Sequence, residues 1–275
     1  MFAPFMLNGW LLGTIVAVLA GALGLFVVLR GASFAAHALP LSTFPGAAAA
    51  ALFGLPQILG LTVFALLGVL GIAELGRRQR RDVATALTLV TMLGLGTLFL
   101  SLSSDYAQGV YALLFGQLVA VSRAELLPVG GMACAVLLAL AASFRPLLLS
   151  SIAPDLAAAQ GLSPRLLDLL FLTLLGLATA MCLPAVGALL VFSLLVGPPA
   201  AARSLTRRPG TALALSVCFA LMTVWIAIAL AYETDWPIGF FVGSIAAALF
   251  LLAEAAGRLS PSLFRERSSA TAQPG

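Results

Sequence analysis

FMLNGWLLGTIVAVLAGALGLFVVL, the segment from Phe5 to Leu29, contains 25 residues and no charged side chain. A helix of this length can cross the roughly 30 Å hydrocarbon core of a lipid bilayer with some tilt. A cleaved signal peptide would carry basic residues ahead of a shorter apolar core, and the segment from Met1 to Met6 has none. The sequence therefore predicts a first membrane span that is retained in the chain, with Arg30 directly after it.

The composition of the whole chain supports the same class. Hydrophobic residues make up 62% of the 275 positions and charged residues 9%, whereas an ordinary soluble domain is about half apolar and about a quarter charged. The mean hydropathy is +1.13. The chain is therefore predicted to be an all-α, multi-pass helical bundle in the cell membrane, surrounded by the lipid bilayer. The net charge of +4 comes from arginines that follow apolar segments, so it indicates membrane topology and no nucleic-acid partner.

Further apolar segments divide the chain into predicted spans. Nine crossings are expected, with eight to ten as the range, and those after the first cover residues 33–55, 57–75, 83–102, 126–142, 166–183, 185–201, 211–231 and 238–256. The apolar run at 110–121 is too short to cross and is expected to lie at the membrane interface. Pro184 is expected to separate two spans. Residues 1–258 form the predicted membrane domain, and the composition of 259–275 predicts a disordered cytoplasmic tail.

The arginines indicate the orientation. With the N-terminus outside and nine crossings, thirteen of the fourteen basic residues fall on the cytoplasmic side, and only Arg123 falls outside. Such an excess follows the positive-inside rule. A tenth crossing at 110–121 would move the eight arginines from Arg145 to Arg267 to the outside. The chain is therefore predicted to have an outer N-terminus and a cytoplasmic C-terminus.

The acidic residues lie near the ends of the predicted spans, and none lies near a span centre. Carriers coupled to protons or sodium keep ionisable groups at mid-membrane, so this class is disfavoured. The three cysteines are widely separated, and the chain has no HExxH motif, serine elbow or phosphate-binding loop, so an enzyme is not expected. Ion pairs are expected at cytoplasmic helix ends, between Glu74 and Arg78, Arg165 and Asp168, and Glu254 and Arg258.

The only histidine of the chain, His37, lies in the segment SFAAHALPLSTFPG, Ser33 to Gly46. An ionisable side chain in a membrane helix tends to face a cavity or a partner, and imidazole binds zinc and similar metals. His37 is therefore the candidate metal-pathway residue. Ser42 and Thr43 are candidates to add oxygen contacts, and Pro45 is expected to kink the helix. The alternative for His37 is a structural role at the cytoplasmic interface, hydrogen-bonded to backbone or water.

Residues 145–165 are predicted to form a polar loop between two spans on the cytoplasmic side. Within it, Asp155 is a good helix N-cap, the Leu and Ala residues after it favour a helix, and Gly161 suits the left-handed position after a helix end. A helix of fewer than two turns is therefore predicted outside the membrane. Such a helix can dock into a soluble motor protein, and an ordinary connecting turn is the alternative.

Four segments carry a family resemblance. They are VVLRGASF (Val27–Phe34), LLFGQLVAVSRAEL (Leu113–Leu126), APDLAAAQGLSPRLLDLLF (Ala153–Phe171) and VGALLVFSLLVGPPAAARSLTRR (Val186–Arg208). In this order they resemble the permease subunits of the zinc, manganese and iron class of ATP-binding-cassette importers. That family has an Asp and, four residues later, a His before Pro-Gly. An ungapped match places His37 at the Asp position and Leu41 at the His position, whereas a four-residue gap aligns His37 with the family's His.

The resemblance implies that this chain is the permease of an ATP-driven importer and that it binds no cofactor of its own. Zinc is the expected cargo, with manganese and iron as alternatives. The family implies a homodimer of permeases, separate cytoplasmic ATPase subunits and an extracytoplasmic metal-binding protein.

The resemblance also assigns roles within the chain. Its coupling segment corresponds to residues 146–165, and Asp155, Ala158 and Gly161 are expected to contact the ATPase. Pro198 and Pro199 are expected to kink a helix of the pathway region. Two other functions stay open: a permease for a metal chelate such as a siderophore or cobalamin, and a structural membrane subunit without transport.

Overall fold

The part of the chain that the structure describes is almost entirely helical. The computed structural model describes residues 4–77, 79–102 and 123–259, and its regular structure is α-helical throughout. The helices are α1 (Pro4–Leu29), α2 (Ser33–Ser42), α3 (Phe44–Phe53), α4 (Gln57–Leu75), α5 (Arg81–Ser101), α7 (Arg123–Ala142), α8 (Phe144–Ile152), α9 (Pro154–Ala159), α10 (Pro164–Val186), α11 (Ala188–Leu205), α12 (Pro209–Thr234) and α13 (Ile238–Leu259). The predicted all-α class is confirmed.

Seven of the described helices are long and apolar enough to span a membrane, namely α1 from Leu7 onward, α4, α5, α10, α11, α12 and α13. The pair α7 and α8 meets the same test only together, with a bend of 63° between its two helices. α2 and α3 have 10 residues each, so each alone is too short to cross. A multi-pass helical membrane protein is confirmed. The count of nine crossings remains a prediction, because length and composition of the described helices support seven or eight.

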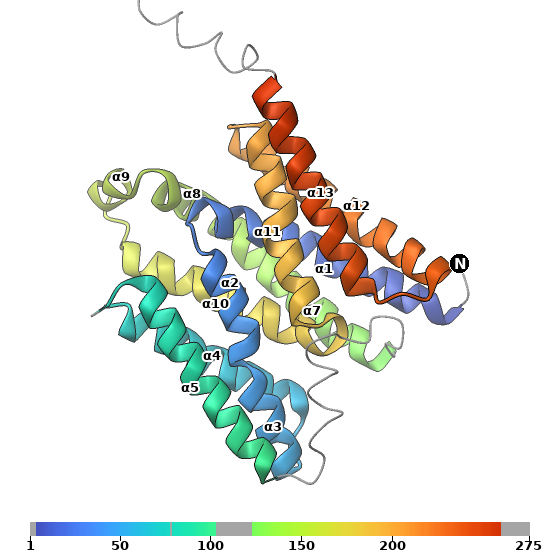
Figure 1. Cartoon of the computed structure of the whole chain (residues 1–275). Helices are drawn as coiled ribbons and strands as arrows, with labels where there is room; N and C mark the ends of the chain where they lie inside the picture. Colours follow the sequence, from blue (N-terminus) through green and yellow to red (C-terminus); the bar gives the residue numbers. More distant parts are fainter. Residues whose placement is uncertain (1–3, 78, 103–122, 260–275) are drawn as a thin grey trace, which may run out of the picture.

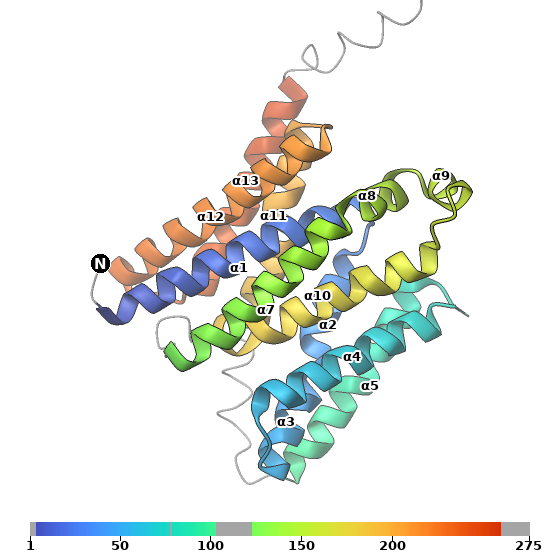
Figure 2. The same cartoon turned by 180° about the vertical axis from the view of Figure 1, so that it is seen from behind.

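The bundle consists of two groups of helices (Figures 1 and 2). In the first helix group, α1 packs against α11 and α12, and α11 packs against α13. In the second helix group, α10 packs against α4 and α2, while α3 and α5 complete the group. α7 contacts both α1 and α10 and so joins the groups. Leu23, Phe26, Leu194 and Leu195, on α1 and α11, are almost completely buried and belong to the main hydrophobic core.

Glycines permit two close helix crossings. A Cβ atom added at Gly24 of α1 would lie 2.5 Å from the carbonyl oxygen of Leu195 and 2.5 Å from Cγ of Pro199, both on α11. A Cβ atom at Gly46 of α3 would lie 2.2 Å from the carbonyl oxygen of Gly60 on α4. These distances are too short for any side chain. Glycine at these two positions therefore permits the close approach of α1 to α11 and of α3 to α4.

Several arginine-bearing helix ends lie on one side of the bundle. Figure 1 shows α8, α9, the end of α4 and the start of α5 on that side, and the start of α1 and the connection between α12 and α13 on the opposite side. This arrangement agrees with the charge distribution from which the sequence predicts the orientation. Which side faces the cytoplasm stays a prediction.

Two predicted helix boundaries differ from the structure. α10 continues past Pro184 to Val186, and the residue that separates it from α11 is Gly187, with φ of +82°. Glycine adopts this backbone conformation without strain. A proline within a membrane helix is tolerated where other groups satisfy the backbone carbonyl that it leaves free. The break between α2 and α3 lies at Thr43, and Pro45 lies in the first turn of α3. A missing N–H is tolerated there because the first turn has no carbonyl partner for it.

The predicted loop at 145–165 is more helical than expected, because α8 occupies its first part and precedes the predicted short helix α9. α8 packs against the bundle through Leu147, which is fully buried. The predicted interface helix at 110–121 and most of the predicted tail, 260–275, lie outside the described residues.

Candidate functional site

His37 lies where the two helix groups meet. It is half-buried on α2, and its ring centroid is 4.8 Å from that of Phe192 on α11, with the rings at 68°. An edge-to-face contact of this kind restricts the orientation of the imidazole. Among the described residues, no group of three or more His, Cys, Asp or Glu side chains is placed to hold a metal ion. Within the described part of one copy, His37 therefore belongs to no cluster of three metal-binding side chains.

Ser42 and Thr43 are fully buried next to the break between α2 and α3. The hydroxyl of Ser42 donates a hydrogen bond to the carbonyl oxygen of Ala38 (2.8 Å), and that of Thr43 donates to the carbonyl oxygen of Pro40 (2.6 Å). Both hydroxyl protons thus stabilise the end of α2. That the two oxygens contact a transported ion stays a prediction.

Pro198 and Pro199 lie inside α11, the helix that carries Phe192, and both are buried. α11 is continuous from Ala188 to Leu205. Proline removes one intrahelical hydrogen bond at each position, which a bundle tolerates where neighbouring helices pack closely. The predicted kink at these prolines remains a prediction.

The predicted coupling segment has a well-defined end. α9 begins at Pro154, and Ala153 is its N-cap, so Asp155 lies in the first turn and is not the capping residue as predicted. Gly161 has a φ of +78°. The N–H of Gly161 donates to the carbonyl of Ala158 (3.0 Å), and the N–H of Leu162 donates to that of Ala157 (3.0 Å). This is the Schellman arrangement, for which glycine is the preferred residue, so the predicted left-handed Gly161 is confirmed.

The outer surface of α9 combines polar and apolar side chains. Ala157 is fully buried, whereas Asp155, Ala158 and Gly161 are exposed. Leu156 is 51% exposed and is not part of the site predicted from the sequence. The signal that could have found Leu156 is an isolated leucine beside an acidic residue in a segment predicted to lie outside the membrane.

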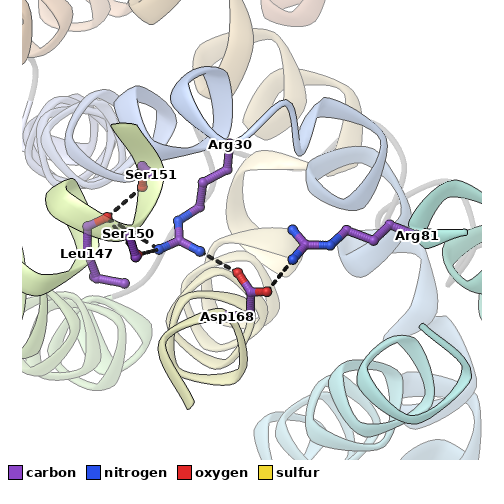
Figure 3. Close-up of polar contacts among 6 residues, drawn as sticks. All are labelled: Arg30, Arg81, Leu147, Ser150, Ser151 and Asp168. Carbon is purple, nitrogen blue, oxygen red and sulfur yellow. Dashed lines mark hydrogen bonds and ion pairs between the residues drawn. The ribbon is translucent and has the colours of Figure 1, made fainter. Parts of the chain in front are cut away.

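A cluster of charged residues contacts α8, the helix that precedes α9 (Figure 3). Arg30, directly after α1, has a side chain that is only 5% exposed, and its Nη1 donates to Oδ1 of Asp168 on α10 at 2.5 Å. Its Nη2 donates to the hydroxyl of Ser150 and, at 3.3 Å, to the carbonyl of Leu147, both on α8. Arg81, at the start of α5, pairs with the other carboxylate oxygen of Asp168. The ends of α1 and α5 are thus connected to α8 and α10 through one carboxylate and two guanidinium groups, of which that of Arg30 is buried.

Burial lowers the pKa of the Arg30 guanidinium from its ordinary value, while the negative charge of Asp168 acts in the opposite direction and Arg81 lowers the pKa further. An arginine side chain nevertheless remains protonated in proteins. The ring of Phe171, whose centroid is 5.2 Å from the guanidinium carbon, adds a cation–π contact. The guanidinium of Arg30 is therefore a permanent positive charge that is largely shielded from water and depends on its protein partners.

The ion pairs predicted from sequence spacing are confirmed only in part. Glu254 pairs with Arg258 at 3.1 Å, as predicted. Glu74 pairs with Arg77 at 2.9 Å, and Arg78 lies outside the described residues. The predicted pair of Asp168 with Arg165 is wrong, because both oxygens of Asp168 are occupied by arginines from other helices. Spacing along a helix cannot reveal such partners, which are 138 and 87 residues away.

The fold and these features define a multi-pass helical membrane protein with a short helix, α9, between two of its longer helices. The chain belongs to the ABC 3 transport family, whose model matches residues 2–257. It is 29% identical over 241 residues to the manganese transport system membrane protein MntC of Halalkalibacterium halodurans, which covers 87% of this chain and 82% of that protein. It is 26% identical over 250 residues to the manganese import system permease protein ScaB of Streptococcus parasanguinis, with coverage of 90% and 89%.

Solved structures share the fold. PsaBC from Streptococcus pneumoniae, in complex with a Fab, matches with a TM-score of 0.83 at 25% identity over 94% of this chain and 96% of the other. An inward-facing conformation of a putative metal-chelate type ABC transporter matches with a TM-score of 0.66 at 22% identity, over 91% and 85%, and this likeness concerns the fold alone. The chain is thus a permease-type membrane subunit, not the ATPase, and a multi-pass protein of the cell membrane.

Proposed function

We propose that this permease translocates divalent transition-metal ions as part of an ATP-driven importer. The support is that relatives covering most of the chain are named as manganese transport proteins, and one from Haemophilus influenzae, 29% identical over 252 residues, as a probable iron transport system membrane protein. We therefore propose manganese or iron as the transported ion in preference to zinc, which is the cargo expected from the sequence. Transport of a metal chelate is the second candidate, and it has no support beyond a shared fold.

The observation that carries the pathway is the half-buried His37 on the broken helix pair α2 and α3, at the interface with α11. Interrupted helices are common at transport sites, because they bring polar groups into an apolar bundle. In our proposal two copies of the chain form a dimer, and each contributes one imidazole to the pathway. Such a site binds weakly, which suits transport because the ion must also leave.

The proposal assigns the partners by side. The N-terminus lies outside, where an extracytoplasmic protein delivers the metal, and α9 lies in the cytoplasm, where it docks into an ATPase subunit. The exposed Asp155, Ala158 and Gly161 form the docking surface, together with Leu156. An apolar side chain surrounded by polar residues is typical of the centre of a protein interface.

Substitution of His37 by alanine tests the pathway. In proteoliposomes that contain the complete complex, we expect uptake of manganese to fall about tenfold, the lower range for damage to a metal site, while the amount of inserted protein stays constant. Ser193→Ala is the matched control, because Ser193 adjoins Phe192 and its hydroxyl bonds only within α11, to the carbonyl of Leu189 (2.9 Å). Equal uptake by His37→Ala and the control would contradict a metal contact.

Substitution of Leu156 by aspartate tests the docking surface. Affinity purification through the permease should recover about tenfold less ATPase, because an interface loses an apolar anchor and gains a desolvated charge. Thr206→Asp is the matched control, because Thr206 lies on another predicted cytoplasmic connection, between α11 and α12. Unchanged ATPase recovery with Leu156→Asp would show that α9 is an ordinary connecting helix.

A further inference from the structure

Arg30 contacts the segment that leads into α9 and also contacts the membrane bundle. Nη1 of its guanidinium donates to Asp168 on α10, and Nη2 donates to Ser150 and to the carbonyl of Leu147 on α8 (Figure 3). Its own backbone continues directly from α1, which belongs to the first helix group, whereas α10 belongs to the second. The planar guanidinium of Arg30 therefore connects the end of α1 to α8 and α10.

The contacts of Arg30 are difficult to replace. The side chain is 5% exposed, and its Nε has no hydrogen-bond partner among the described residues. A buried charge that loses one of its few partners has no water to substitute, so separation of its partners is costly. A displacement of α8 relative to α10 would remove either the Asp168 contact or the α8 contacts. The cost of that loss favours movement of α8 and α10 as one unit.

Arg81 makes a different contribution to the same carboxylate. Its side chain is 70% exposed, so water can replace Asp168 when the pair separates, and an exposed ion pair contributes little. Among the described residues, no hydrogen bond joins Arg81 to Ser150 or Leu147. It is therefore a matched comparison: the same residue type on the same carboxylate, without burial and without a contact to α8.

We propose that Arg30 is the positioning residue that transmits movement of the α8–α9 segment to α1 and α10, so that ATP hydrolysis is coupled to transport. This rests on the proposed function, in which α9 docks into the ATPase. α8 is joined to α9 through Ala153 alone, so a push on α9 reaches α8, and through the Arg30 guanidinium it reaches a helix of each group. Arg30 touches neither the metal nor the nucleotide in this role.

The test uses the complete complex, purified through the permease and reconstituted in proteoliposomes, with manganese as the transported ion. The measured quantity is the number of ions taken up per ATP hydrolysed, which a purely structural role of Arg30 would not alter in the molecules that fold. Lysine keeps the charge at position 30 but lacks the two-armed geometry that bridges Asp168 and α8. For Arg30→Lys we expect this ratio to fall about fivefold or more, the lower range of measured couplings between sites. Arg81→Lys should change it less than about twofold.

Each outcome decides the proposal. An unchanged ratio for Arg30→Lys overturns it, even if less complex is recovered, and so does an equal fall for Arg81→Lys. If Arg30→Lys does not insert, Ser150→Ala is measured in its place, because it removes one α8 acceptor and leaves the charge paired with Asp168; an unchanged ratio then overturns the proposal. Failure of the wild-type complex to retain its ATPase or to take up manganese is distinguishable, because it rejects the proposed function before any variant is compared.

Discussion

Gly24→Ala is expected to lower the apparent unfolding midpoint of the purified permease by about 5 °C, which corresponds to about 2 kcal/mol for a chain of this size. The new Cβ would lie 2.5 Å from the carbonyl oxygen of Leu195 and 2.5 Å from Cγ of Pro199. Neither atom can move easily, since one belongs to the backbone of α11 and the other to a rigid ring. α1 and α11 would have to separate along the centre of the first helix group.

Thermal unfolding in detergent, followed by size-exclusion chromatography, measures this effect. Gly94→Ala is the matched control, because Gly94 lies within the span α5 and a Cβ there meets nothing within 4 Å. Alanine is the better helix former by about 1 kcal/mol, so the control should be neutral or slightly more stable. Equal midpoints for the two variants would show that α1 and α11 do not cross as closely as the structure has them.

Asp168→Ala should have the larger effect, a loss of about 3–5 kcal/mol in the free energy of unfolding. The substitution leaves Arg30, whose side chain is 5% exposed, without its carboxylate. A buried guanidinium without a counter-charge is costly because it can neither lose its proton nor reach water. We therefore expect little folded protein from Asp168→Ala in detergent.

A second substitution separates charge from packing. In the double variant Arg30→Met with Asp168→Ala, both charges are absent, and much of the lost stability should return because no unpaired charge remains. Arg81→Met is the control and should cost about 1 kcal/mol or less, since its side chain is 70% exposed. If Asp168→Ala costs no more than Arg81→Met, the buried pair does not stabilise this fold.

The span boundaries show how much of the fold can be predicted from local sequence. The predicted segment 57–75 coincides with α4, and the predicted start of the last span at residue 238 coincides with that of α13. These predictions succeed because a long apolar segment between turn residues forms a helix in a membrane. The prediction failed at Pro184, which lies within α10. Whether a proline ends a helix depends on the helices packed around it.

The candidate site was predicted in part. The left-handed Gly161 follows from local chemistry, since few other residues adopt that backbone conformation. Leu156 and Arg30 were not predicted as functional residues: exposure distinguishes the leucine, and burial distinguishes the arginine. Both are properties of the tertiary structure. A single arginine at a helix end resembles any other topology-determining arginine in the sequence.

The sequence alone determines that this protein is a multi-pass membrane bundle, because the cost of polar backbone in lipid leaves the helix as the solution for long apolar segments. The same hydrophobicity says nothing about which helix lies beside which, since lipid and neighbouring helices are equally apolar. The tertiary structure decides that Asp168 pairs with Arg30 and Arg81 and not with Arg165. It also decides that His37 faces Phe192 of α11, because these contacts depend on close packing between segments far apart in the chain.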